Sequence, residues 1–141
     1  MRPALLLLAA ALALPAEAQH ADVTPWMTGQ HLVKMLGNVN PENINWTPDS
    51  PFRSRAAAAE FQDRTNGEFV HGYIQAVHDA TEGKLWCLSD KYQPHPEELE
   101  ADARHALQRM PDAELKRNAA ALIAEVWRSK WPCPANKRVA K

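Results

Sequence analysis

The sequence lacks the short motifs by which the common enzyme classes are identified. It contains no G-x-S-x-G, no H-E-x-x-H and no glycine-rich phosphate loop, so nothing indicates a serine hydrolase, a zinc protease or a nucleotide-binding site. Neither cysteine belongs to a C-x-x-C or a C-x-x-C-H motif, so thiol redox catalysis and covalent haem attachment are not expected. These absences argue against an enzyme and leave a hydrolytic enzyme as the weakest hypothesis.

An excess of either charge is also lacking. The chain carries 16 basic and 17 acidic residues, for a formal net charge of −1. Bulk charge of this size attracts neither nucleic acid nor an anionic membrane surface. We therefore expect no nucleic-acid partner.

The histidines do not form a metal-binding pattern. His71 and His78 lie seven positions apart on one predicted helix, with Asp79 alongside, whereas zinc sites on a helix more often use a spacing of three or four. An exposed or packing role is the preferred interpretation, and a metal or acid–base role is the alternative. No metal and no cofactor are predicted.

The N-terminus is typical of a secretory signal peptide. One positive charge precedes an unbroken apolar run over residues 4–14, and an Ala-Glu-Ala triplet ends at Ala18. That triplet fits the small-x-small cleavage pattern, so the mature chain is expected to begin at Gln19. The apolar run is shorter than the roughly 20 residues of a membrane-spanning helix, which makes an anchor or a buried helix the lesser alternative. We expect residues 1–18 to be cleaved, residues 19–141 to form one exported domain, and no membrane contact afterwards.

Both cysteines lie in the mature part of the chain. Cys87 and Cys133 allow one intramolecular pairing, and exported proteins meet an oxidising compartment in which paired thiols persist as disulfides. A pair of metal-binding thiolates is the competing interpretation.

Hydrophobic periodicity predicts an all-α fold, a small bundle of about four helices with one disulfide. A first helix is expected over residues 28–36, because Thr28 can cap it and Gly37 can end it. A second is expected over residues 55–81, with an apolar stripe at helical spacing formed by Val70, Tyr73, Ile74 and Val77 and extended by Phe61 and Phe69.

Two more helices are expected toward the C-terminus. Pro96 suits a first helical position, and the third helix runs from there to a turn at Pro111-Asp112. The fourth follows this turn and ends before Pro132, since proline cannot continue a helix. A tight turn would make the two antiparallel, so that the disulfide closes the open end of a helical hairpin, with Trp86, Trp127 and Trp131 close enough in sequence to cover it.

A long segment without periodicity separates the first two helices. Residues 37–53 contain three prolines and four asparagines, which favour turns. The same segment holds three large apolar side chains, those of Ile44, Trp46 and Phe52. A loop of this length is often functional. We therefore consider two interpretations, a structural loop packed on the core and a loop that presents a sticky surface.

One combination of motifs goes beyond composition. The segment F-V-H-G-Y-I-Q-A-V-H-D-A spans residues 69–80, Trp86-Cys87 and P-E-E-L follow it, and W-P-C-P lies over residues 131–134. In this order the motifs resemble the Rap/Tai family of immunity proteins, the periplasmic antidotes to type VI secretion amidase toxins. The match covers about residues 56–135.

The resemblance implies an all-helical fold, a disulfide between Cys87 and Cys133, location in the periplasm and a binding role without catalysis. It also implies a cell-wall amidase toxin as the partner, and possible homodimers. We expect Ile44, Trp46 and Phe52 to be the candidate contact with that effector, with the helix surfaces as the alternative. The competing function is that of a small periplasmic stress or chaperone-like protein.

Overall fold

The computed structural model describes residues 25–89 and 93–134, so the predicted signal peptide lies outside the described residues. The helices follow one another in the order α1 (Gly29–Leu36), the 3-10 turn η1 (Pro41–Asn43), α2 (Arg55–Thr81), α3 (Pro96–Arg109), α4 (Asp112–Leu115) and α5 (Ala119–Lys130). Over these described ranges the chain forms helices and isolated bridges but no strands, which confirms the predicted all-α class. None of the described helices is long and apolar enough to cross a membrane.

Local capping explains where the helices begin. The hydroxyl of Thr28 accepts a hydrogen bond from the backbone N–H of His31 at 3.1 Å, and that of Ser54 accepts one from Ala57 at 3.1 Å. Such caps satisfy backbone donors that have no partner within the helix. They agree with the predicted starts of α1 and α2, because the signals lie in the adjacent residues.

The predicted fourth helix is wrong as a single element, because residues 116–118 divide it into α4 and α5. At the break, the N–H of Gly29 donates to the carbonyl oxygen of Arg117 at 3.0 Å, and the N–H of Ala119 donates to that of Met27 at 3.0 Å. Backbone groups that a continuous helix would have used internally therefore pair with Met27 and with Gly29, at the start of α1. The side chain of Asn118 then caps α5.

Gly29 allows the close approach at this junction. A Cβ atom on Gly29 would lie 2.8 Å from Leu122 Cδ1 and 2.9 Å from Leu115 Cδ2. Carbon atoms this close overlap, and the Leu115 carbonyl oxygen would lie only 3.0 Å away, so a larger residue would require the buried Leu115 and Leu122 side chains or the adjoining backbone to shift.

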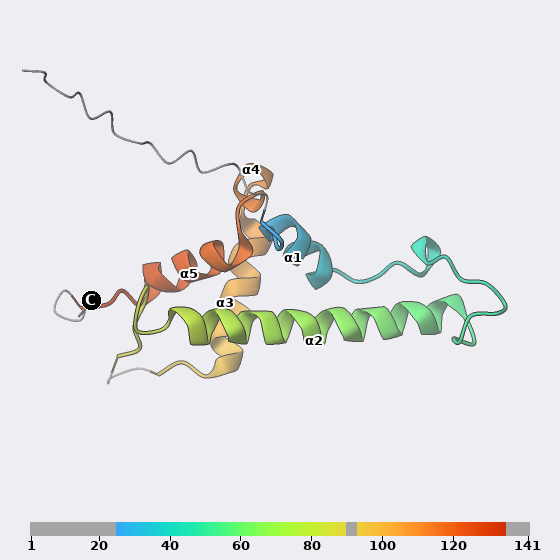
Figure 1. Ribbon diagram of the computed structural model, residues 1–141, viewed down its shortest axis with the longest axis horizontal. Coiled ribbons are helices and arrows are strands. Elements are labelled where there is room, and N and C mark those ends of the chain that lie inside the picture. Colours follow the sequence, from blue (N-terminus) through green and yellow to red (C-terminus); the bar gives the residue numbers. More distant parts are fainter. Residues whose placement is uncertain (1–24, 90–92, 135–141) are drawn as a thin grey trace, which may run out of the picture.

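The predicted antiparallel hairpin is also wrong. α3 crosses α5 in Figure 1, whereas α2 and α5 run alongside each other and end at the same side of the molecule. The Cys87–Cys133 disulfide, with the Cα atoms 4.7 Å apart, therefore connects the segment after α2 to the segment after α5. The predicted pairing is confirmed, although the helices that it connects are different ones.

The tryptophans lie where the sequence predicts, beside this disulfide. Trp86 and Trp127 are fully buried, and their ring centroids are 5.0 Å apart. The ring of Trp131 lies 6.0 Å from that of Trp86, and the carbonyl oxygen of Trp131 accepts a hydrogen bond from the Cys87 N–H at 2.9 Å. The disulfide and the cluster of tryptophan rings thus stabilise the same end of the domain.

The connected hydrophobic cluster of the core ends halfway along α2, and only Ala58 and Ala59 are buried in the half of the helix before Val70. The α2 residues in the core cluster are Val70, Ile74 and Val77, and the first half of the helix extends beyond the other helices (Figure 1). The chain between α1 and α2 folds back along this projecting half, with η1 in contact with α2. We call residues 38–69, which comprise this loop and the first half of α2, the arm.

Removal of the disulfide should lower stability substantially. The bond closes a loop with a sequence separation of 46, for which the chain-entropy model gives about 4 kcal/mol. Urea unfolding of the Cys87→Ser/Cys133→Ser variant should show a loss of that order in the free energy of unfolding, with the helical circular dichroism retained in water. A loss below about 1 kcal/mol would contradict this account.

Candidate functional site

The structure brings the three predicted contact residues together. Ile44, Trp46 and Phe52 form one wall of a groove of about 330 Å³ on the arm. The opposite wall comes from α2, through Ala58, Phe61, Gln62 and Thr65. The predicted loop thus packs on the projecting half of α2, outside the core cluster, and the two together form a recess on the surface. We call this recess the arm groove.

Contacts within the loop hold the aromatic side chains in place. The indole N–H of Trp46 donates to the carbonyl oxygen of Phe52 at 2.7 Å, and the rings of Phe52 and Phe61 have centroids 5.1 Å apart. Trp46 and Phe52 are half-buried, whereas Phe61 is 52 % exposed. The loop aromatics are therefore walls of a recess, and Phe61 offers the most accessible apolar surface in it.

None of the described residues that line the arm groove has an ionisable side chain. Its polar groups are amides and hydroxyls, namely those of Asn45, Ser50, Gln62 and Thr65. Such a lining can bind an apolar side chain and hydrogen-bond to its flanking peptide groups, and it offers neither a general base nor a set of metal ligands.

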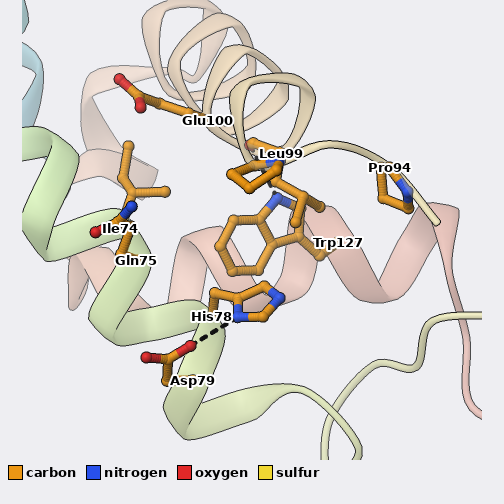
Figure 2. Close-up of a pocket in the computed structure, with 9 residues that line it drawn as sticks. Ile74, Gln75, His78, Asp79, Pro94, Leu99, Glu100 and Trp127 are labelled. Carbon is orange, nitrogen blue, oxygen red and sulfur yellow. Dashed lines mark hydrogen bonds and ion pairs between the residues drawn. The ribbon is translucent and has the colours of Figure 1, made fainter.

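A second recess of about 330 Å³ lies between α2, α5 and the start of α3. Figure 2 shows His78 from α2 beside the Trp127 indole, with Asp79 hydrogen-bonded to the histidine ring. The distance from His78 Nδ1 to Asp79 Oδ1 is 2.9 Å. The apolar floor belongs to the core, because Ile74, Leu99 and Trp127 are all at most 4 % exposed. Its rim carries the ionisable side chains of His78, Asp79 and Glu100, which the arm groove lacks.

The Glu100 carboxylate at the edge of this second recess is already paired. One oxygen lies 2.5 Å from His71 Nδ1, and the other accepts from the Arg104 guanidinium at 2.7 Å. Partial burial acts to raise the pKa of this carboxyl, but the hydrogen bonds from His71 and Arg104 outweigh burial and hold the pKa below its usual value. The result is an ionic link between α2 and α3.

The two histidines that the sequence places on one helix face have different partners. His71 contacts Glu100 of α3, whereas His78 contacts Asp79 and the rings of Trp86 and Trp127. Among residues 25–89 and 93–134, no group of three or more His, Cys, Asp or Glu side chains is arranged to hold a metal ion.

Sequence reasoning missed an exposed apolar face of α2. Phe61 and Phe69 were expected to extend the buried stripe of this helix, and that expectation is wrong: they are 52 % and 45 % exposed. The core ends at Val70, so the same periodicity continues onto the surface. Beyond Phe69 this face carries small exposed residues at helical spacing; we call the set the α2 stripe, comprising Phe69, Gly72, Ala76 and Ala80.

Comparison with known proteins identifies the family. No curated protein gives a match to this chain. A family model described as Rap1a immunity proteins, however, matches residues 28–133. The match extends from the cap of α1 to the second disulfide cysteine, which is most of the chain and nearly all of the helical domain described above. The chain therefore belongs to the Rap1a immunity protein family.

Proposed function

We propose that this protein binds and neutralises a peptidoglycan amidase that neighbouring cells deliver by type VI secretion. Membership of an immunity family implies a secreted effector as the partner. The single observation that supports the contact site is the arm groove, in which aromatic walls and uncharged polar groups meet on a part of the molecule that projects from the core. Inhibition by occlusion needs no catalytic group in this chain.

The arm has the physical properties that tight binding requires. Tryptophan and tyrosine are enriched among the residues that dominate binding energy, and apolar recesses surrounded by hydrogen-bonding groups are typical of such centres. The Trp46 and Phe52 contacts hold the loop before any partner arrives. A loop ordered in advance lowers the entropic cost of association. In this proposal the arm enters or covers the active-site cleft of the amidase.

A chaperone-like function is the second candidate. The exposed rings of Phe61 and Phe69 are of the kind that would bind unfolded apolar segments, and an exposed apolar surface of this sort marks an interaction site. A chaperone would bind many unfolded chains weakly, whereas an immunity protein binds one folded effector.

We also propose that the protein acts in the periplasm after removal of residues 1–18. Mass spectrometry of protein from the periplasmic fraction should give Gln19 as the N-terminus, because the Ala-Glu-Ala triplet before it fits the cleavage pattern. An Ala16→Phe/Ala18→Phe variant, with bulky residues at both small positions, should retain its N-terminal segment. Recovery of an intact Met1 from the periplasm would contradict the proposal.

The resemblance to the family also implies homodimers, and we propose the α2 stripe as the seam between two copies. Its small residues would let two helices approach closely, and Phe69 would gain cover. Sedimentation should give the mass of two chains for the wild type and of one chain for Ala76→Glu, whose charge lies in the seam. Gln75→Glu adds the same charge one position away and should stay dimeric. A wild-type protein of one-chain mass at micromolar concentration would overturn this seam.

Protection of cells is the decisive test of the function. Cells that export the cognate amidase to the periplasm should lyse without this protein and survive with it. Trp46→Ala and Phe61→Ala should each weaken binding of the purified amidase by more than about 1 kcal/mol, because each removes part of the groove wall. Leu85→Ala is the matched control, since Leu85 is 48 % exposed and lies outside the arm groove.

The outcomes separate the site from the function. Full protection together with normal binding by the Trp46 and Phe61 variants would show that the arm groove is not the contact, and the immunity function would stand. Absence of both binding and protection against an amidase encoded beside this gene would contradict the immunity proposal and favour the chaperone-like function.

A further inference from the structure

One hydrogen bond attaches the beginning of the loop between α1 and α2 to α2 itself. The backbone N–H of Val39 donates to Oδ1 of Asp63 at 2.7 Å, in a part-buried position. Asp63 lies about two turns into α2, and Val39 is three residues beyond the end of α1. The bond therefore fixes the loop at the point where it leaves the core.

Among the described residues, no second hydrogen bond of this kind joins the loop to α2. Within the part of the chain that the structure describes, the other hydrogen bonds of residues 38–53 stay inside the loop, as in the pairs Asn40–Glu42 and Trp46–Phe52. The end of the loop is attached to α2 through the contact between the Phe52 and Phe61 rings. The loop that forms one wall of the arm groove is thus held against α2 by a hydrogen bond near its beginning and by an aromatic contact near its end.

The hydrogen bond from Val39 to Asp63 is of a strong type. A carboxylate that accepts a backbone N–H forms a charge-assisted hydrogen bond, which is shorter and stronger than a bond between neutral groups. Loss of the carboxylate would leave the part-buried Val39 N–H without a partner, which is itself unfavourable. Both effects would free the part of the loop that carries Ile44 and Trp46 from its position against α2.

The geometry points to Asp63 as a positioning residue for effector recognition. Asp63 does not line the arm groove, so it acts through Val39, holding the loop against α2 so that the groove exists before the effector arrives. The assignment rests on the proposed function only for the identity of the partner. The hydrogen bond between Val39 and Asp63 is itself a property of the free protein.

A positioning role and a contact role have different kinetic signatures. When the binding-competent loop is only partly populated, the apparent association rate falls with that population, while the dissociation rate of the complex stays the same. Loss of a direct contact acts mainly on dissociation. Asp63 and Gln62 therefore form an informative pair, since both lie on α2 and only Gln62 lines the arm groove.

The experiment uses the mature full-length protein and compares Asp63→Ala with Asp63→Asn. The alanine variant should exchange the Val39 amide hydrogen at least tenfold faster and should bind the amidase about tenfold more weakly, through slower association. The asparagine variant keeps an acceptor oxygen at the same place and should stay within about threefold of the wild type in both measurements. Gln62→Ala, which removes a side chain that lines the groove, should instead raise the dissociation rate.

Glu60→Ala is the control for loss of a negative charge from α2. Glu60 is exposed and pairs with Arg64 of the same helix at 3.6 Å, so its removal should change neither Val39 exchange nor association. Asp63 lies outside the core cluster, and the thermal midpoint of Asp63→Ala should stay within a few degrees of the wild type. Should the alanine variant not fold, Asp63→Glu, which displaces the acceptor by one methylene, serves in its place.

Three results would overturn the assignment: unchanged Val39 exchange in Asp63→Ala, weaker binding that arises from faster dissociation, or an asparagine variant as impaired as the alanine one. A wild-type protein that binds no amidase would instead contradict the proposed function. The Val39 exchange rates would still decide whether Asp63 orders the loop, so the two failures can be told apart.

Discussion

The indole of Trp127 is the contact on which the arrangement of the helices depends. It is fully buried, its N–H donates to the carbonyl oxygen of Leu99 in α3 at 3.1 Å, and its ring packs against Trp86 and His78. One side chain of α5 thus meets α3, α2 and the segment that leads to Cys87. Truncation of a buried tryptophan typically costs 3–5 kcal/mol, which is similar to the roughly 4 kcal/mol that the chain-entropy model gives for a disulfide of this span. Ring packing and the covalent bond therefore stabilise the same end of the domain to a comparable degree.

The parts of the fold that depend on adjacent residues could be predicted from the sequence. Thr28 and Gly37 delimit α1, and Pro96 begins α3, because these signals act over a few positions. The division between α4 and α5 could not be predicted, since its cause is backbone pairing with residues 27–29, about 90 positions earlier in the chain. The crossing of α3 and α5 was missed for the same reason. A short turn favours antiparallel neighbours, but long-range packing overrides that preference here.

The residues of the candidate site likewise include some that the sequence could predict and some that it could not. The grouping of Ile44, Trp46 and Phe52 was expected because large apolar residues are unusual in a loop rich in proline and asparagine. The role of Phe61 was missed, because helical periodicity identifies a face and cannot tell where the core that covers it ends. Asp63 carried no signal at all, since an acidic residue in an exposed part of a helix is commonplace. Its importance lies in a partner 24 positions away.

The separation of the arm from the core has a consequence for how the gene can change. Residues 38–69 contribute none of the side chains of the core cluster, and only Ala58 and Ala59 among them are buried, so substitutions at the exposed positions of the arm should disturb the folding of the domain little. In the binding mode that we propose, selection for a new partner and selection for a stable fold then act on different stretches of sequence. In that binding mode, a lineage that meets an altered effector can diverge in the arm by a few substitutions, without compensating changes around the tryptophans, and copies of one scaffold can acquire different specificities after gene duplication.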